Sequence, residues 1–211
     1  MLGDFDEIIE LPLADEIIQY GIVYGSNTIV FIKAGANGSM HGYENKYLQI
    51  AKNINTSHGY TVICSSNPDY CRENPIQQAI ELISNYAESK EFDDYKIFYM
   101  GHSDGASLGA RYGHLYPKIK RMLLVNSPLF FNWHLIKDGM KQFTGEKAVF
   151  VYGDLDPSYK YAEMINLIGN DRVKLEIIEG ADHHFVDKLD EFIDLPNKYL
   201  LWLFFFFTKT S

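Results

Sequence analysis

The stretch Gly101-His102-Ser103-Asp104-Gly105 decides how this chain is expected to fold, because it lies at a transition from strand to helix. The residues before it, 95–100, are mainly aromatic and aliphatic and predict a short buried strand. Those after it, 106–111, predict a helix that carries small residues on one face. A sharp turn between the two would expose the Ser103 hydroxyl at the edge of a sheet, and the flanking glycines leave space for it. Ser103 is therefore a candidate nucleophile, and the alternative is a surface serine in a glycine-rich turn.

Strand and helix patterns alternate along the chain on both sides of this motif. Strands are predicted over 6–13, 16–24, 28–32, 60–64, 95–100, 121–125, 147–152 and 173–178. Helices are predicted over 44–55, 74–87, 106–111, 133–142, from Pro157 to 168, and over 185–193. This alternation predicts an α/β fold with a mainly parallel sheet of about seven to eight strands, helices on both faces and an antiparallel strand pair at the N-terminus. The length fits a single domain over 1–211.

Composition narrows the function classes. The net charge is −9 and no cluster of Lys and Arg stands out, which argues against a nucleic-acid partner. Two cysteines, Cys64 and Cys71, do not form a disulfide framework and suit a reducing compartment. The acidic start 1–6 lacks the pattern of a secretion signal. We therefore expect a cytoplasmic protein.

The segment from Leu200 to Phe207 is strongly apolar. It is far shorter than the roughly 20 residues that a membrane-spanning helix needs, so no membrane span is expected. Three alternatives stay open for it: a terminal segment packed on the core, a contact that makes a homodimer, and an anchor on a membrane surface.

A nucleophilic serine needs a histidine base and a carboxylate that orients the histidine. Loops that follow parallel strands meet at one edge of the sheet, so both groups are expected after later strands. The loop after 147–152 offers two acids, Asp154 and Asp156, either of which is also suited to cap a helix that Pro157 begins. The loop after 173–178 offers His183 and His184. A metal site at this histidine pair is disfavoured, because adjacent side chains diverge and no third ligand has suitable spacing.

Together, these loops resemble those of the α/β-hydrolase superfamily. Gly153 to Asp156 matches the G-x-x-D of its acid loop, and Gly180 to Phe185 matches the G-x-x-H-x-F of its histidine loop. The family order of nucleophile, acid and histidine is also present. The resemblance covers about 28–193 and implies a serine hydrolase in which Ser103 is the nucleophile, His183 the base and Asp156 the acid that orients it.

The same resemblance implies an oxyanion hole made of two backbone N–H groups. One is expected from Asp104, directly after the nucleophile, and the other from Ala36, in the loop after 28–32. Relatives often carry His-Gly where this chain has Ala34-Gly35, so the bracing of the loop is in question. A His-Gly pair occurs later, at 41–42, but it lies farther from the strand.

Ester hydrolysis through an acyl-serine is the activity that the resemblance implies, without metal or cofactor. Only about one helix fits between the strands 121–125 and 147–152, so no large lid is expected, and an open site favours small or short-acyl esters. Tyr43, Phe130, Phe131 and Trp133 either flank such a site or pack in the core. Thioester or peptide hydrolysis by the same triad stays open. So does an inactive scaffold that binds a ligand or a protein.

Overall fold

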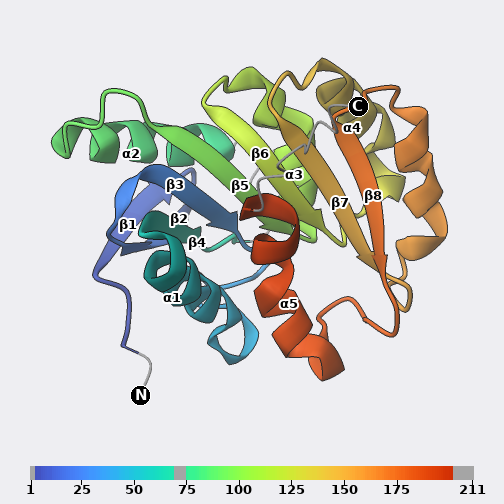
Figure 1. The fold of residues 1–211 in the computed structure, drawn as a ribbon, viewed down its shortest axis with the longest axis horizontal. Coiled ribbons are helices and arrows are strands. Elements are labelled where there is room, and N and C mark those ends of the chain that lie inside the picture. Colours follow the sequence, from blue (N-terminus) through green and yellow to red (C-terminus); the bar gives the residue numbers. More distant parts are fainter. Residues whose placement is uncertain (1–2, 69–74, 202–211) are drawn as a thin grey trace, which may run out of the picture.

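The computed structural model describes residues 3–68 and 75–201, and an eight-stranded sheet lies at its centre (Figure 1). The strand order is β1-β2-β4-β3-β5-β6-β7-β8. Strand β2 is antiparallel to β1 and to β4, and all other neighbours are parallel. The predicted fold class is confirmed. The strands are β1 Glu7–Leu13, β2 Glu16–Val23, β3 Ser26–Lys33, β4 Tyr60–Ser65, β5 Lys96–His102, β6 Ile119–Val125, β7 Lys147–Gly153 and β8 Val173–Ile178.

Helices cover both faces of the sheet (Figure 1). On one face lie α1 (Lys46–His58) and α5 (Leu189–Leu195), which contribute to one apolar core. On the other face α2 (Pro75–Ser89), α3 (Asp104–Tyr112) and α4 (Leu129–Gln142) build a second core. Strands β3 to β7 are largely buried between the two cores, which explains why they read as almost continuous apolar runs.

Three helices differ from their predicted form. The stretch Tyr159–Leu167 is a 3-10 helix, and its buried residues Ala162 and Ile165, with Ile168 just after it, recur every third position, which is the period of that helix. Helix α4 begins before the predicted 133 because a kink at Asn132 joins an extra turn to it. The last helix opens with 3-10 geometry at Val186–Lys188 before α5. Shorter 3-10 elements are Tyr43–Asn45 and Gly113–Leu115, and Pro196–Leu201 is a π-helix.

The apolar C-terminal segment lies only partly within the described residues. Leu200 and Leu201 are buried against the α1 and α5 core, and Arg121 donates a hydrogen bond to the Leu200 carbonyl at 3.2 Å. Residues 202–207 fall outside the described part, and the homodimer contact stays a prediction. Among the helices in 3–68 and 75–201, none is long and apolar enough to cross a membrane.

Helix α4 fills the whole connection between β6 and β7 and packs on α3. Its Ile136 and Met140 are buried in the core, so most of the helix belongs to the body of the fold. Gly139 makes the tightest approach, since a Cβ atom there would lie 2.3 Å from the Ala110 carbonyl oxygen on α3. The connection therefore forms a docked helix, as expected for a chain without a large lid.

We predict that Gly139→Ala destabilises the protein by about 1–3 kcal/mol, because the added methyl group overlaps the backbone of α3. Urea unfolding measures the change. Gly3→Ala is the matched control, since a Cβ atom there would meet nothing within 4 Å. Alanine is the better helix former, so a Gly139→Ala protein as stable as the original would show that α4 is not held tightly.

Candidate active site

Ser103 lies at the turn between β5 and α3 in a backbone conformation that serine rarely adopts. Its φ is 54° and its ψ is −120°, and its N–H donates to the Val125 carbonyl at 2.8 Å. Two glycines make the turn possible. A Cβ at Gly101 would lie 2.5 Å from the backbone of Gly105, and one at Gly105 would lie 2.4 Å from the Lys33 carbonyl oxygen. A conformation of this kind costs on the order of 1–3 kcal/mol and is typical of functional sites.

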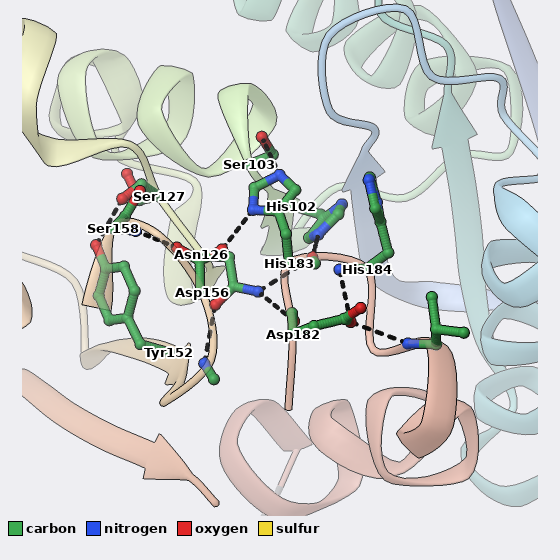
Figure 2. Close-up of polar contacts among 12 residues, drawn as sticks. His102, Ser103, Asn126, Ser127, Tyr152, Asp156, Ser158, Asp182, His183 and His184 are labelled. Carbon is green, nitrogen blue, oxygen red and sulfur yellow. Dashed lines mark hydrogen bonds and ion pairs between the residues drawn. The ribbon is translucent and has the colours of Figure 1, made fainter. Parts of the chain in front are cut away.

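The structure brings the three expected catalytic residues into contact. The His183 Nε2 lies 3.0 Å from Ser103 Oγ, and its Nδ1 makes a short hydrogen bond to Asp156 Oδ2 (Figure 2). Because the Asp156 carboxylate can only accept, Nδ1 carries the proton and Nε2 is free to accept from the serine. The side chain of Asp156 is fully buried, whereas that of His183 is 31% exposed. A histidine in this state can remove the serine proton.

The two acids of the loop after β7 have separate roles. Asp156 uses both oxygens: Oδ2 binds His183, and Oδ1 accepts the Ser158 N–H at 2.5 Å. The second bond closes the turn before Tyr159–Leu167, whose N-cap is Ser158, so Asp156 does not cap that helix and pairs with the histidine instead. Asp154 Oδ1 accepts the Gly180 N–H at 2.6 Å and fastens its own loop to the histidine loop.

Hydrogen bonds connect Tyr47 of α1 with β5 and the histidine loop, beside the loop after β3. The Tyr47 hydroxyl lies 3.3 Å from His102 Nδ1 and close to the Gly35 backbone N–H. The His102 Nε2–H donates to the His183 carbonyl at 2.8 Å. Burial, together with the nearby Lys46 charge, lowers the pKa of His102 well below its usual value, so its ring is neutral and Nδ1 accepts from the tyrosine. These contacts place buried polar groups next to Gly35, which follows Ala34, where the resemblance implies a histidine.

Asn126 is a supporting residue that the sequence interpretation did not identify. It follows β6 directly, with a positive φ of 49°, and its side-chain amide donates to the carbonyls of Asp182 and His183 at 3.2 and 3.1 Å (Figure 2). Its Oδ1 accepts the Gly153 N–H at 3.0 Å. An asparagine at the carboxyl end of a strand tolerates this backbone conformation, which is the sequence signal that could have found it.

Asp182 and His184 do not touch the serine. The Asp182 carboxylate accepts the backbone N–H groups of His184 and Val186 at 3.1 and 3.0 Å, which closes the histidine loop. Burial, with His183 and Lys46 as neighbours, lowers the pKa of His184. Within the described residues no group of three His, Cys, Asp or Glu side chains is placed to hold a metal ion.

An open cavity of about 470 Å³ lies beside Ser103. Ala36 lines it, and the preceding Gly35 is so close to the serine that a Cβ there would lie 3.0 Å from Ser103 Cβ. Asp104 is the first residue of α3, where N–H groups have no partner within the helix. The two expected oxyanion donors therefore flank the serine, and their role stays a prediction.

The expected aromatic residues divide into two groups. Tyr43 lines the cavity, as does Gly42 of the later His-Gly pair, whereas the ring of His41 turns away to the Asp4 carboxylate at 3.1 Å. Phe130 and Phe131 are exposed at the start of α4, and their rings contact each other edge to face. Trp133 packs against the apolar core to which α2, α3 and α4 contribute. None of these three residues is among those that line the cavity.

Solved structures share this architecture at low sequence identity. An alpha-beta serine hydrolase homologue from Coxiella burnetii is 18% identical with a TM-score of 0.67, and the match covers 90% of this chain and 95% of that one. Dienelactone hydrolase from Anabaena variabilis is 13% identical with a TM-score of 0.65, covering 92% and 97%. The esterase domain of a Rhodothermus marinus protein is 10% identical with a TM-score of 0.61, covering 92% and 98%. The chain has the α/β-hydrolase fold.

Sequence comparison adds nothing to this. No protein-family model and no curated protein matches the chain.

We predict that Tyr47→Phe lowers the free energy of unfolding by about 1–3 kcal/mol, because it leaves the buried His102 Nδ1 without its hydrogen-bond partner. Chemical denaturation measures the loss. Tyr43→Phe is the control, since Tyr43 is 52% exposed, and it should change stability by less than about 0.5 kcal/mol. Equal stability of the two variants would contradict the role given to the tyrosine hydroxyl.

Proposed function

We propose that this protein is a serine hydrolase that cleaves small or short-acyl carboxylic esters through an acyl-serine. The observation that carries the proposal is the His183 ring, which contacts Ser103 Oγ at 3.0 Å on one side and the buried Asp156 carboxylate on the other. The serine at the centre has strained backbone geometry, and a cavity adjoins it. Nucleophile, base and orienting acid are the parts that acyl transfer requires.

In the first half of the reaction, Ser103 Oγ attacks the ester carbonyl carbon while His183 Nε2 takes the hydroxyl proton. The tetrahedral intermediate collapses, and the alcohol departs with that proton, which leaves the acyl group on the serine. Asp156 holds the imidazole in the required tautomer and stabilises its positive charge. The N–H groups of Ala36 and Asp104 are the proposed donors to the oxyanion, each worth on the order of 3 kcal/mol.

In the second half, water replaces the alcohol. His183 removes a proton from the water as its oxygen attacks the acyl carbon, and the proton passes back to Ser103 Oγ when the carboxylic acid leaves. The cavity supports a small acyl or alcohol group, since its volume is about 470 Å³ and α4 packs on the body of the fold instead of closing over the site.

A fluorophosphonate probe tests the proposal. An activated serine displaces fluoride from phosphorus quickly, so we expect covalent labelling at Ser103 that peptide mass spectrometry locates. Labelling should vanish in Ser103→Ala and after unfolding of the protein. A folded protein that stays unlabelled would refute the hydrolase and favour the binding scaffold.

The choice among acyl compounds is tested with one acyl group presented as ester, thioester and amide. We expect the ester to be cleaved with the highest kcat/KM. A thioester or amide that reacts faster than the ester would move the assignment to a thioesterase or a peptidase while leaving the triad in place.

A pair of variants distinguishes the roles of Asp154 and Asp156. Asp156→Asn should lower kcat/KM for a short-chain ester by on the order of 10³- to 10⁴-fold, because the amide has one acceptor oxygen for the two donors, Ser158 N–H and His183 Nδ1–H, and its NH2 group cannot accept the second. Asp154→Asn keeps an oxygen for the Gly180 N–H and should retain most of the activity. A large loss in Asp154→Asn alone would assign the orienting role to the other acid.

A further inference from the structure

Lys46 is a buried cation at the wall of the cavity. It is the first residue of α1, its exposed fraction is 2%, and it lines the same cavity as Ser103. Its Nζ lies 4.1 Å from the centre of the Phe192 ring and 3.5 Å from the His184 carbonyl oxygen, a long distance for a hydrogen bond. The ammonium group thus retains capacity for a further acceptor.

In the part of the chain that the structure describes, no carboxylate forms an ion pair with this charge. Asp182 is near enough to favour its charged form, but the Asp182 carboxylate accepts two backbone N–H groups of its own loop. Burial prevails and lowers the pKa of Lys46 to about 8. The lysine is therefore still mainly protonated at neutral pH.

Stability of the fold does not account for a cation at this position. A buried charge without a counterion is costly, and the first turn of a helix favours negative charge, not positive. The first turn of α1 holds no acidic residue to compensate. A residue that works against stability and faces a cavity is a candidate for function.

The cavity is also unusual in its charge. The chain carries 28 acidic residues, yet none of the described residues that line the cavity is Asp or Glu. Its ionisable lining consists of Lys46, two tyrosines and three histidines. The positive charge of Lys46 attracts an anion, and no carboxylate among the described lining residues repels it.

We propose that Lys46 binds a carboxylate of the substrate, so that the preferred substrates are small esters that also carry a free carboxylate. This inference rests on the proposed function, since it names the substrate class of the same site. The ammonium group would form a charge-assisted hydrogen bond with the carboxylate while the ester carbonyl lies at Ser103. A cation–π contact with the Phe192 ring stabilises the charged form of the lysine.

Two matched pairs of esters test the inference and locate the carboxylate. Monoethyl glutarate and its terminal amide, ethyl 4-carbamoylbutanoate, place the charge on the acyl side. 4-Carboxyphenyl acetate and 4-carbamoylphenyl acetate place it on the alcohol side. In each pair the amide is close to the acid in shape and lacks its charge, so the ratio of kcat/KM for acid over amide, compared with the same ratio for Lys46→Met, measures charge recognition. We expect a ratio of about tenfold or more in at least one pair, and ratios near one in both pairs overturn the inference.

Lys46→Met removes the charge and keeps the apolar stem. The acid-over-amide ratio should fall about tenfold toward one, while the melting temperature stays equal or rises. Lys52→Met is the matched control on the same helix, because Lys52 pairs with Asp6 at the surface and should leave the ratio unchanged. A ratio that persists in Lys46→Met, with a lower melting temperature, would assign the lysine a structural role and refute the inference.

The pH dependence of the original protein gives a test that needs no variant. The groups facing Lys46 are Asp182 and His184 from the histidine loop, His102 from β5 and the adjacent Tyr47. Both of these histidines have lowered pKa values and the tyrosine a raised one, so they keep their charge state as pH rises from neutral. Only the lysine loses a proton, and the ratio should decline above about pH 8.

These outcomes separate the two proposals. A protein that hydrolyses amide-bearing and acid-bearing esters equally, or whose preference is constant up to about pH 9.5, keeps the proposed function and loses the inference. A protein that hydrolyses none of the four esters and leaves Ser103 unlabelled by a fluorophosphonate loses both.

Discussion

The turn at Ser103 depends on backbone segments that touch without a side chain between them. Helix α3 begins so close to the end of β3 that only glycine fits at position 105, and β5 approaches the same turn through Gly101. Gly35 extends the contact to the serine itself. Because these approaches fix the start of α3 and the loop after β3 relative to one another, they also fix the cavity and both proposed oxyanion donors. Larger residues at these glycines would displace the whole edge of the sheet.

Hydrogen bonds to its backbone carbonyls hold the histidine loop in place. The His183 carbonyl accepts from His102 and from Asn126, which belong to two different strand ends. Through His102 the same network includes Tyr47, whose hydroxyl lies close to the Gly35 backbone. Base and nucleophile therefore belong to one partly buried polar assembly beside the loop after β3, and the loss of one member leaves others unsatisfied. Rigid placement of this kind limits the reorganisation needed during the reaction.

Periodicity sufficed to predict all eight strands and the topology class, because buried parallel strands are apolar throughout and helices show a one-sided stripe. Local motifs also placed Ser103, Asp156 and His183 at one sheet edge, where the structure joins them. Tyr47 could not be found in this way, and the sequence signals Asn126 only as an asparagine at the end of a strand. The partners of Asn126 are backbone groups and the partner of Tyr47 is the His102 ring, all on segments distant in the sequence, so no local pattern reveals these bonds. The sequence predicts a helix after β7 but not its 3-10 form, because apolar residues three apart also fit one face of an α-helix over so short a stretch.

The backbone conformation of Ser103 exposes the hydroxyl for its proposed reaction but lowers the stability of the fold. A glycine at that position would adopt φ 54° and ψ −120° with far less strain, and would relieve part of the cost that the serine imposes. The most stable version of this turn is therefore one that has lost its hydroxyl. If a library of variants is selected for thermal stability alone, we expect inactive variants without the hydroxyl to be enriched. Engineering of this protein for stability therefore requires an activity assay in every round.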